Sequence, residues 1–146
     1  MKFYNEITVN ISLERLIALF ENPDNLKKWQ PNIISFEHLS GEIGQVGAKS
    51  RIHYDLTIRK IMMVETILKR NLPNEFVILY ESDGVSNTVT NSFKELNDDQ
   101  TQWTVHNEFQ FSGMMKFAAG ALKTVFKKQT ELTQERFKDF AEKQTN

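Results

Sequence analysis

The 146-residue sequence contains no cysteine, only three prolines and only six glycines. Without cysteine it has no disulfide framework, thiolate nucleophile, iron–sulfur cluster or cysteine-ligated zinc. It also lacks an excess of charge of one sign, because its formal net charge at pH 7 is −1. That balance gives no bulk attraction to nucleic acid or to an anionic membrane. We therefore expect no nucleic-acid partner, no metal and no other cofactor.

Long hydrophobic runs are absent as well. No stretch approaches the roughly 18 apolar residues of a membrane-spanning helix, and the N-terminal residues lack the apolar segment of a secretory signal. We expect a cytoplasmic protein without integral membrane association. Repeats, low-complexity tracts and Pro/Gly-rich linkers are also missing, so residues 1–146 are expected to form one domain, as a monomer or homodimer. The 40% hydrophobic share, with eleven phenylalanines, is sufficient for a core.

Alternation of apolar and polar residues predicts a sheet. The expected strands are 2–11, 33–39, 49–56, 59–70, 75–81, 85–96 and 101–111. Turn residues such as Pro73-Asn74 and Asp83-Gly84 join the later strands by short links, which implies an antiparallel meander. The sequence therefore favours seven antiparallel strands.

Helical spacing appears in two places. After the first strand, Ser12 can cap a short helix, and Pro23 begins a second that ends near Trp29. Residues 114–143 contain no proline and predict one helix about 45 Å long, which must lie across the whole sheet. The expected fold class is α+β, with the order β-α-α-β6-α.

Three stretches carry a resemblance to a known superfamily. They are 7–12 (ITVNIS) running into 16–20 (LIALF), 22–31 (NPDNLKKWQP), and the hairpin 41–47 with its three glycines. In this order the stretches resemble the bacterial branch of the START-like, or SRPBCC, superfamily. That superfamily includes pollen-allergen-like proteins, polyketide cyclase/dehydrase-like proteins and lipid-transfer domains. The resemblance implies a helix-grip fold, in which a curved seven-stranded antiparallel sheet wraps the long C-terminal helix and leaves a cavity between them.

Strand parity selects candidates for the lining of such a cavity. In the third strand, Ile52, Tyr54 and Leu56 should face inward, and neutral polar residues interrupt the apolar inward faces of later strands. Apolar walls with a few polar groups are typical of small-molecule sites. The alternative is that these residues satisfy one another or fill the core. The candidate ligand-binding residues are Tyr54, Met63, Tyr80, Asn91, Asn107, Phe109, Met114, Ala118 and Leu122.

Glu65 is the one candidate for acid–base catalysis. If it faces inward among Met and Ile side chains, desolvation raises its pKa and suits it to proton transfer. However, the strand 59–70 is apolar on both parities, and a one-residue bulge would turn Glu65 to solvent. The sequence pattern of this strand does not determine whether the Glu65 side chain faces the interior or the solvent. No metal-ligand spacing of histidines and no serine-hydrolase, P-loop or Rossmann motif accompanies it.

Two other features have competing interpretations. Trp29 is either a lid over a pocket mouth or a plug that closes one end of the grip. Lys116, Lys123, Lys127 and Lys128 have no acidic residue among them, so they form either a solvated face or a surface for anionic lipid or an acidic partner.

These observations favour binding or transport over catalysis. The leading hypothesis is a protein that holds a small, hydrophobic and largely uncharged ligand, of lipid, polyketide or aromatic type, in the cavity between sheet and helix. The first alternative is a polyketide cyclase- or dehydratase-like enzyme that uses Glu65 with a tyrosine for proton transfer. The second is a protein-interaction or stress-related module.

Overall fold

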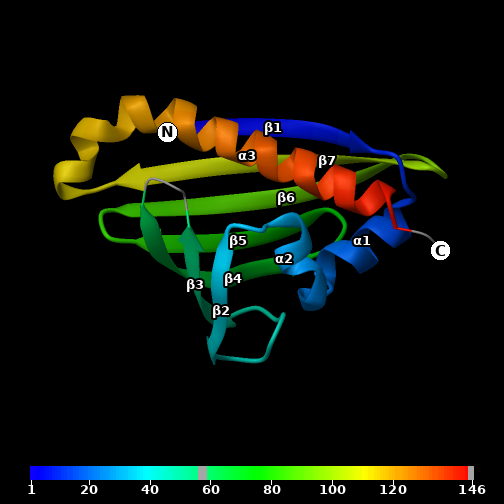
Figure 1. The fold of residues 1–146 in the computed structure, drawn as a ribbon, viewed down its shortest axis with the longest axis horizontal. Helices are drawn as coiled ribbons and strands as arrows, with labels where there is room; N and C mark the ends of the chain where they lie inside the picture. Colours follow the sequence, from blue (N-terminus) through cyan, green and yellow to red (C-terminus); the bar gives the residue numbers. More distant parts are fainter. Residues whose placement is uncertain (56–58, 145–146) are drawn as a thin grey trace.

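The computed structural model describes residues 1–55 and 59–144 (Figure 1). Leu56, expected to face inward, lies outside the described residues. Seven strands form one sheet within the described part of the chain, with helical segments after the first strand and after the last. The elements in chain order are β1 (Lys2–Val9), α1 (Leu13–Glu21), η1 (Pro23–Asn25), α2 (Leu26–Trp29), β2 (Ile33–Ser40), β3 (Lys49–Asp55), β4 (Lys60–Asn71), β5 (Glu75–Ser82), β6 (Val85–Asn97), β7 (Gln100–Phe111), η2 (Gly113–Ala118) and α3 (Ala119–Glu142).

The strands are antiparallel and lie in the order β1-β7-β6-β5-β4-β3-β2. The helix α3 runs along β1 and β7, and the α1–α2 segment covers the same side of the sheet nearer to β2 (Figure 1). With 24 residues, α3 is about 36 Å long, so it spans the sheet. This arrangement confirms the expected fold class, an open antiparallel sheet with short helices after the first strand and a long C-terminal helix.

Local sequence signals explain where the first helices begin. The Ser12 side chain accepts a hydrogen bond from the Arg15 amide at 3.2 Å, as the capping residue of α1. Asn22 does the same for η1 by accepting from the Asp24 amide, with Pro23 in the first turn. The chain therefore breaks into two helical pieces that fold back over the sheet.

The main core lies where α1, α2 and the C-terminal half of α3 meet the sheet. Phe137 is fully buried and meets Trp29 and Trp103 edge-on, with ring centroids 5.0 and 5.3 Å apart. Phe20 adds contacts from α1 to the same rings. Trp29 is only 4% exposed, so it plugs this end of the grip.

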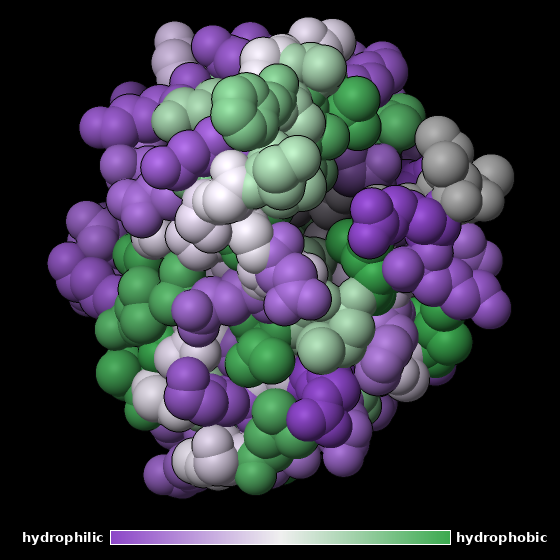
Figure 2. All heavy atoms as spheres, turned by 90° about the vertical axis from the view of Figure 1, so that its left-hand side faces the viewer, coloured by the Kyte–Doolittle hydropathy of each residue, from purple (hydrophilic) through white to green (hydrophobic). Residues whose placement is uncertain are grey.

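The long C-terminal helix departs from the sequence prediction at its beginning. Residues 113–118, expected to belong largely to one α-helix, form the separate 3₁₀ helix η2. Short 3₁₀ turns are common at the ends of α-helices. Met114 and Phe117 of this segment are 83% and 87% exposed, and apolar side chains reach the surface at this end of the molecule (Figure 2). No helix in the described ranges is long and apolar enough to span a membrane.

Strand register resolves the direction of Glu65. It lies directly opposite Ser50 on β3 and Tyr80 on β5. Directly opposed residues place their side chains on the same face of a sheet, and Ser50 is buried. The only shift between β4 and β5 falls between Ile67 and Lys69, beyond Glu65. Glu65 therefore faces the interior.

Candidate functional site

A cavity of about 170 Å³ lies between the α1–α2 segment and strands β2 to β5. It reaches the surface, because Asn22, Pro23 and Phe36 at its rim are exposed. Its wall is mostly aromatic and aliphatic, with few polar groups. The lining residues are Phe20, Glu21, Asn22, Pro23, Leu26, Trp29, Gln30, Ile33, Phe36, Ile52, Tyr54, Glu65, Ile78 and Tyr80.

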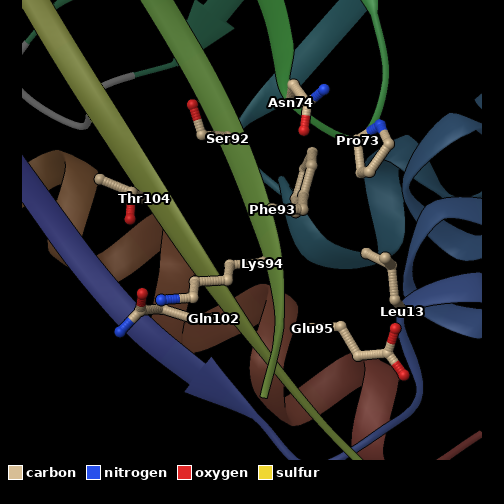
Figure 3. A pocket seen from close by; sticks show the side chains of 9 residues that line it. All are labelled: Leu13, Pro73, Asn74, Ser92, Phe93, Lys94, Glu95, Gln102 and Thr104. Atoms are coloured by element: carbon tan, nitrogen blue, oxygen red, sulfur yellow. The ribbon is translucent and has the colours of Figure 1, made fainter. Parts of the chain in front are cut away.

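A larger depression, of about 500 Å³, lies on another part of the molecule (Figure 3). Its residues come from the start of α1, the β4–β5 turn and the strands β6 and β7, and Figure 3 shows them spread along these elements. Its charged members, Lys94 and Glu95, are exposed. Since no buried ionisable group faces this depression, we place the candidate site in the smaller cavity.

Glu65 and Tyr80 form the polar end of the smaller cavity. They are paired across β4 and β5, and the Tyr80 hydroxyl hydrogen-bonds the Glu65 carboxyl group. Burial raises the pKa of Glu65 to about 7, and the hydrogen bond from Tyr80 offsets part of this rise. At neutral pH the carboxyl group is therefore close to half protonated, and it can donate or accept a hydrogen bond.

Tyr54 completes this polar end from β3. Burial raises its pKa above the ordinary value, and the nearby charge of Glu65 raises it further. Burial also raises the pKa of Tyr80, and the neighbouring Glu65 and Tyr54, together with the hydrogen bond to Glu65, raise it further. Both phenols thus stay protonated at neutral pH. The three side chains keep a modest exposed fraction because the cavity itself leaves part of their surface accessible.

Charge and donor groups elsewhere in the wall are few. Glu21, at the rim, forms an ion pair with Arg70, and no lysine or arginine lines the cavity. The indole N–H of Trp29 is buried and has no hydrogen-bond partner among the described residues. A buried donor left unpaired costs free energy, so an acceptor that reaches it is favoured. Nowhere in the described part of the chain do three acidic or histidine side chains gather to hold a metal ion.

The predicted asparagines lie elsewhere and hydrogen-bond other side chains. Asn91 accepts from the Trp103 indole N–H at 3.0 Å and donates to the Phe76 carbonyl at 3.4 Å. Asn107 accepts from the Asn87 amide at 2.9 Å and donates to Thr130 of α3 at 3.4 Å. These bonds link Asn91 to β7 and β5, and Asn107 to β6 and α3.

The predicted apolar residues are also outside the wall of this cavity. Phe109 stacks on Phe126 of α3, with ring centroids 4.5 Å apart. Met63 lies on β4 two residues from Glu65 and is half-buried, and Ala118 and Leu122 are half-buried at the start of the C-terminal helical segment. Met114 is 83% exposed and does not face the interior. Of the predicted set, only Tyr54 and Tyr80 join Glu65 in the cavity wall.

Sequence reasoning missed the part of the wall that comes from α1 to β2. Phe20, Leu26, Ile33 and Phe36 line the cavity, but they were not among the candidates. The helical spacing of Phe20 and Leu26 signals burial, whereas nothing local shows which part of the sheet they cover. Strand alternation places Ile52 inward with Tyr54, and Ile78 shares the parity of Tyr80, so both could have been added to the ligand-binding candidates.

Comparison with known proteins supports the fold and does not supply a function. No protein-family profile and no curated protein matches the sequence. Among solved structures, a START superfamily protein from Mycobacterium smegmatis superposes with a TM-score of 0.82 at 13% identity, over 99% of each chain. The Zhui aromatase/cyclase from Streptomyces sp. R1128 gives 0.80 at 13% identity, over 97% of this chain and 93% of that one.

A plant enzyme is similar to the same degree. Norcoclaurine synthase from Thalictrum flavum superposes with a TM-score of 0.76 at 13% identity, over 100% of this chain and 89% of its own. At such identities the likeness concerns the fold. The sheet topology, the gripping C-terminal helix and these superpositions together show that the chain has the helix-grip fold of START-like, SRPBCC-type proteins.

Proposed function

We propose that this protein binds a small, largely apolar and uncharged molecule in the cavity beneath the α1–α2 segment. The observation that carries the proposal is the pairing of Glu65 with Tyr80 at one end of an otherwise apolar, partly open cavity. A few polar groups that converge in an apolar pocket orient a ligand, while the apolar wall provides most of the binding free energy.

The size of the cavity limits the ligand. An engineered apolar cavity of about 150 Å³ accommodates benzene, and the cavity here measures about 170 Å³. A ligand with one aromatic ring and a short polar substituent fits that volume. The substituent can bond with Glu65 and the tyrosines.

The structural neighbours support the same class of function. One is described as a START superfamily protein, one as an aromatase/cyclase, and one was solved with dopamine and hydroxybenzaldehyde bound. All three descriptions concern those proteins. They are consistent with a fold whose interior receives small organic molecules.

A titration followed by NMR tests the proposal. Phenylethanol, a neutral one-ring alcohol, is added to isotopically labelled protein, and we expect shifts that saturate in β3, β4, β5 and the α1–α2 segment. Ile78→Phe places extra volume in the cavity and should weaken binding, whereas Leu79→Phe adds the same group on the opposite face of β5. Tyr54→Phe tests the polar end without changing the volume.

Either of two results would count against binding in this cavity. Shifts confined to the larger depression, or equal binding by the Ile78 and Leu79 variants, would contradict the proposal. Native mass spectrometry of the purified protein provides an independent check, since a retained molecule should be lost in the Ile78 variant and kept in the Leu79 variant.

A second candidate function is proton-transfer catalysis of the cyclase or dehydratase kind. It is favoured by the pKa of Glu65, which burial raises to about 7, and by the tyrosine hydroxyl bonded to it. A group with a pKa near the working pH both takes and returns a proton readily. Glu65 would act as the base, and Tyr80 or Tyr54 would hold the developing negative charge of the substrate.

Nitrobenzisoxazole is a suitable probe for this second candidate. A base removes the proton on its ring carbon, the N–O bond breaks to give a nitrile and a phenolate, and a coloured cyanonitrophenolate is released, after which Glu65 returns the proton to water. We expect a rate that rises with pH with a midpoint near 7 and is lost in Glu65→Gln. Glu81→Gln, on the exposed face of β5, should keep the rate. Equal rates in the two variants would refute a catalytic role for Glu65.

A further inference from the structure

Exposed apolar and basic side chains gather where the C-terminal helical segment begins. This end of the molecule faces the viewer in Figure 2, with apolar side chains at the surface next to hydrophilic ones. We call the group the η2–α3 patch. Its members are Met114 and Phe117, with Lys116, Lys123, Lys127 and Lys128.

The geometry of η2 explains why two large apolar side chains point outward. In a 3₁₀ helix, residues three apart lie on the same side, so Met114 and Phe117 project together, at 83% and 87% exposure. Met115 is half-buried on another side and packs closely against Gly84 of the β5–β6 turn. Its contact fixes the segment to the sheet. Met114 and Phe117 therefore form the apolar part of the patch.

The charge around these side chains is of one sign. From residue 113 to residue 130 the sequence contains four lysines and no acidic residue. Lys123 and Lys127 are four residues apart and share one face of α3. Lys128 forms an exposed ion pair with Glu131 at 3.5 Å, and the β5–β6 turn that contacts Met115 carries the exposed Asp83. The patch is therefore basic although the whole chain has a net charge of −1.

We propose that the η2–α3 patch docks the protein on an anionic lipid surface. Phe117 and Met114 enter the headgroup region, and the lysines lie against the lipid phosphates and carboxylates. Exposed apolar residues beside lysines on a helical segment are the combination that binds at a lipid–water interface. The docking is independent of what the cavity binds.

The size of the patch favours a lipid surface over a protein partner. A stable protein interface takes about 800 Å² and some 20–30 residues from each partner, whereas here two exposed apolar side chains stand among lysines. A bilayer needs no matching shape, because single side chains insert separately and lipid headgroups rearrange around each lysine.

Co-sedimentation with vesicles tests this proposal. The full chain is mixed with vesicles of phosphatidylcholine alone, and with vesicles that also contain phosphatidylserine. We expect binding to the anionic vesicles only, and weaker binding at high salt, because the screening length falls from about 10 Å at 0.1 M to about 3 Å at 1 M. At constant ionic strength, free inorganic phosphate should not compete, since a single anion does not receive the apolar side chains.

Variants separate the two contributions. Lys123→Gln with Lys127→Gln should weaken binding about 25-fold, at about fivefold per lysine. Met114→Ser with Phe117→Ser should weaken it further at every salt concentration. The matched controls are Lys60→Gln with Lys94→Gln, and Ile43→Ser, whose side chain is 71% exposed in the β2–β3 loop.

All substituted side chains are exposed, so unchanged melting temperatures should show that the variants remain folded. Equal binding to neutral vesicles, no binding to anionic ones, or the same loss in the control variants would overturn the proposal. Competition by free phosphate would point to a simple anion site and would overturn it as well.

Discussion

Replacing Glu65 by glutamine should change how the stability of this protein depends on pH. Burial raises the pKa of Glu65 from 4.5 to about 7 in the folded state. Between these values the folded protein holds a proton that the unfolded chain has lost, so the free energy of unfolding falls as the pH rises from 4.5 to 7. The difference of about 2.5 pH units, at about 1.36 kcal/mol each, amounts to about 3 kcal/mol lost above pH 7.

Glutamine has nearly the same shape, keeps an acceptor for the Tyr80 hydroxyl and does not ionise. We therefore expect Glu65→Gln to match the wild-type stability below pH 4.5 and to exceed it by about 3 kcal/mol above pH 7. Urea unfolding of both proteins at several pH values measures the difference, in which the contributions of all other titrating groups cancel.

Glu81→Gln is the matched control, because Glu81 follows Tyr80 on β5 and is exposed on the opposite face. Its pH dependence should follow that of the wild type. A difference between Glu65→Gln and wild type that stays constant with pH would refute the desolvation argument. If the variant lost stability relative to wild type as the pH rose, Glu65 would instead be stabilised by a cationic group.

Three further substitutions test the site and the core. Tyr80→Phe removes the hydrogen bond that lowers the pKa of Glu65. The free energy of unfolding should therefore keep falling to a higher pH than in the wild type, and the total loss above pH 7 should be about 2 kcal/mol larger. The same urea series measures it. Asn91→Leu leaves the buried Trp103 N–H without its acceptor and should cost about 1–3 kcal/mol, whereas the exposed Asn74→Leu should cost little in the same unfolding assay. Phe137→Ala opens a cavity among Trp29, Phe20 and Trp103 and should cost about 3–5 kcal/mol, seen as a lower unfolding midpoint; a smaller loss would mean that this core relaxes around the gap.

The loss of folding stability when Glu65 ionises also bears on the role of this residue. A carboxyl group that weakens the fold at neutral pH is expected to persist where it has a function, because sites that bind or react often reduce stability. The same measurement therefore connects the energetics of the cavity with the proposed function. A variant that is more stable and no longer binds a ligand would show both effects in one residue.

The amino-acid sequence by itself determined the architecture. Strand alternation, the cap at Ser12, the helix start at Pro23 and the proline-free C-terminal stretch are local signals, and they indicated which segments form strands and helices. The order of these elements, with the stretches that resemble START-like proteins, was enough to predict the helix-grip fold.

Only the tertiary structure decided which side chains meet. The strand β4 is apolar on both faces, so its pattern could not show to which face the Glu65 side chain points. The register with β3 and β5 places Glu65 beside Tyr80. The same long-range pairing brings Asn91 within hydrogen-bond distance of the Trp103 indole N–H. Side-chain contacts of this kind depend on how strands far apart in sequence align and on where the α1–α2 segment folds back. Neither is encoded in a local period, which is why the sequence could indicate a cavity but not its wall.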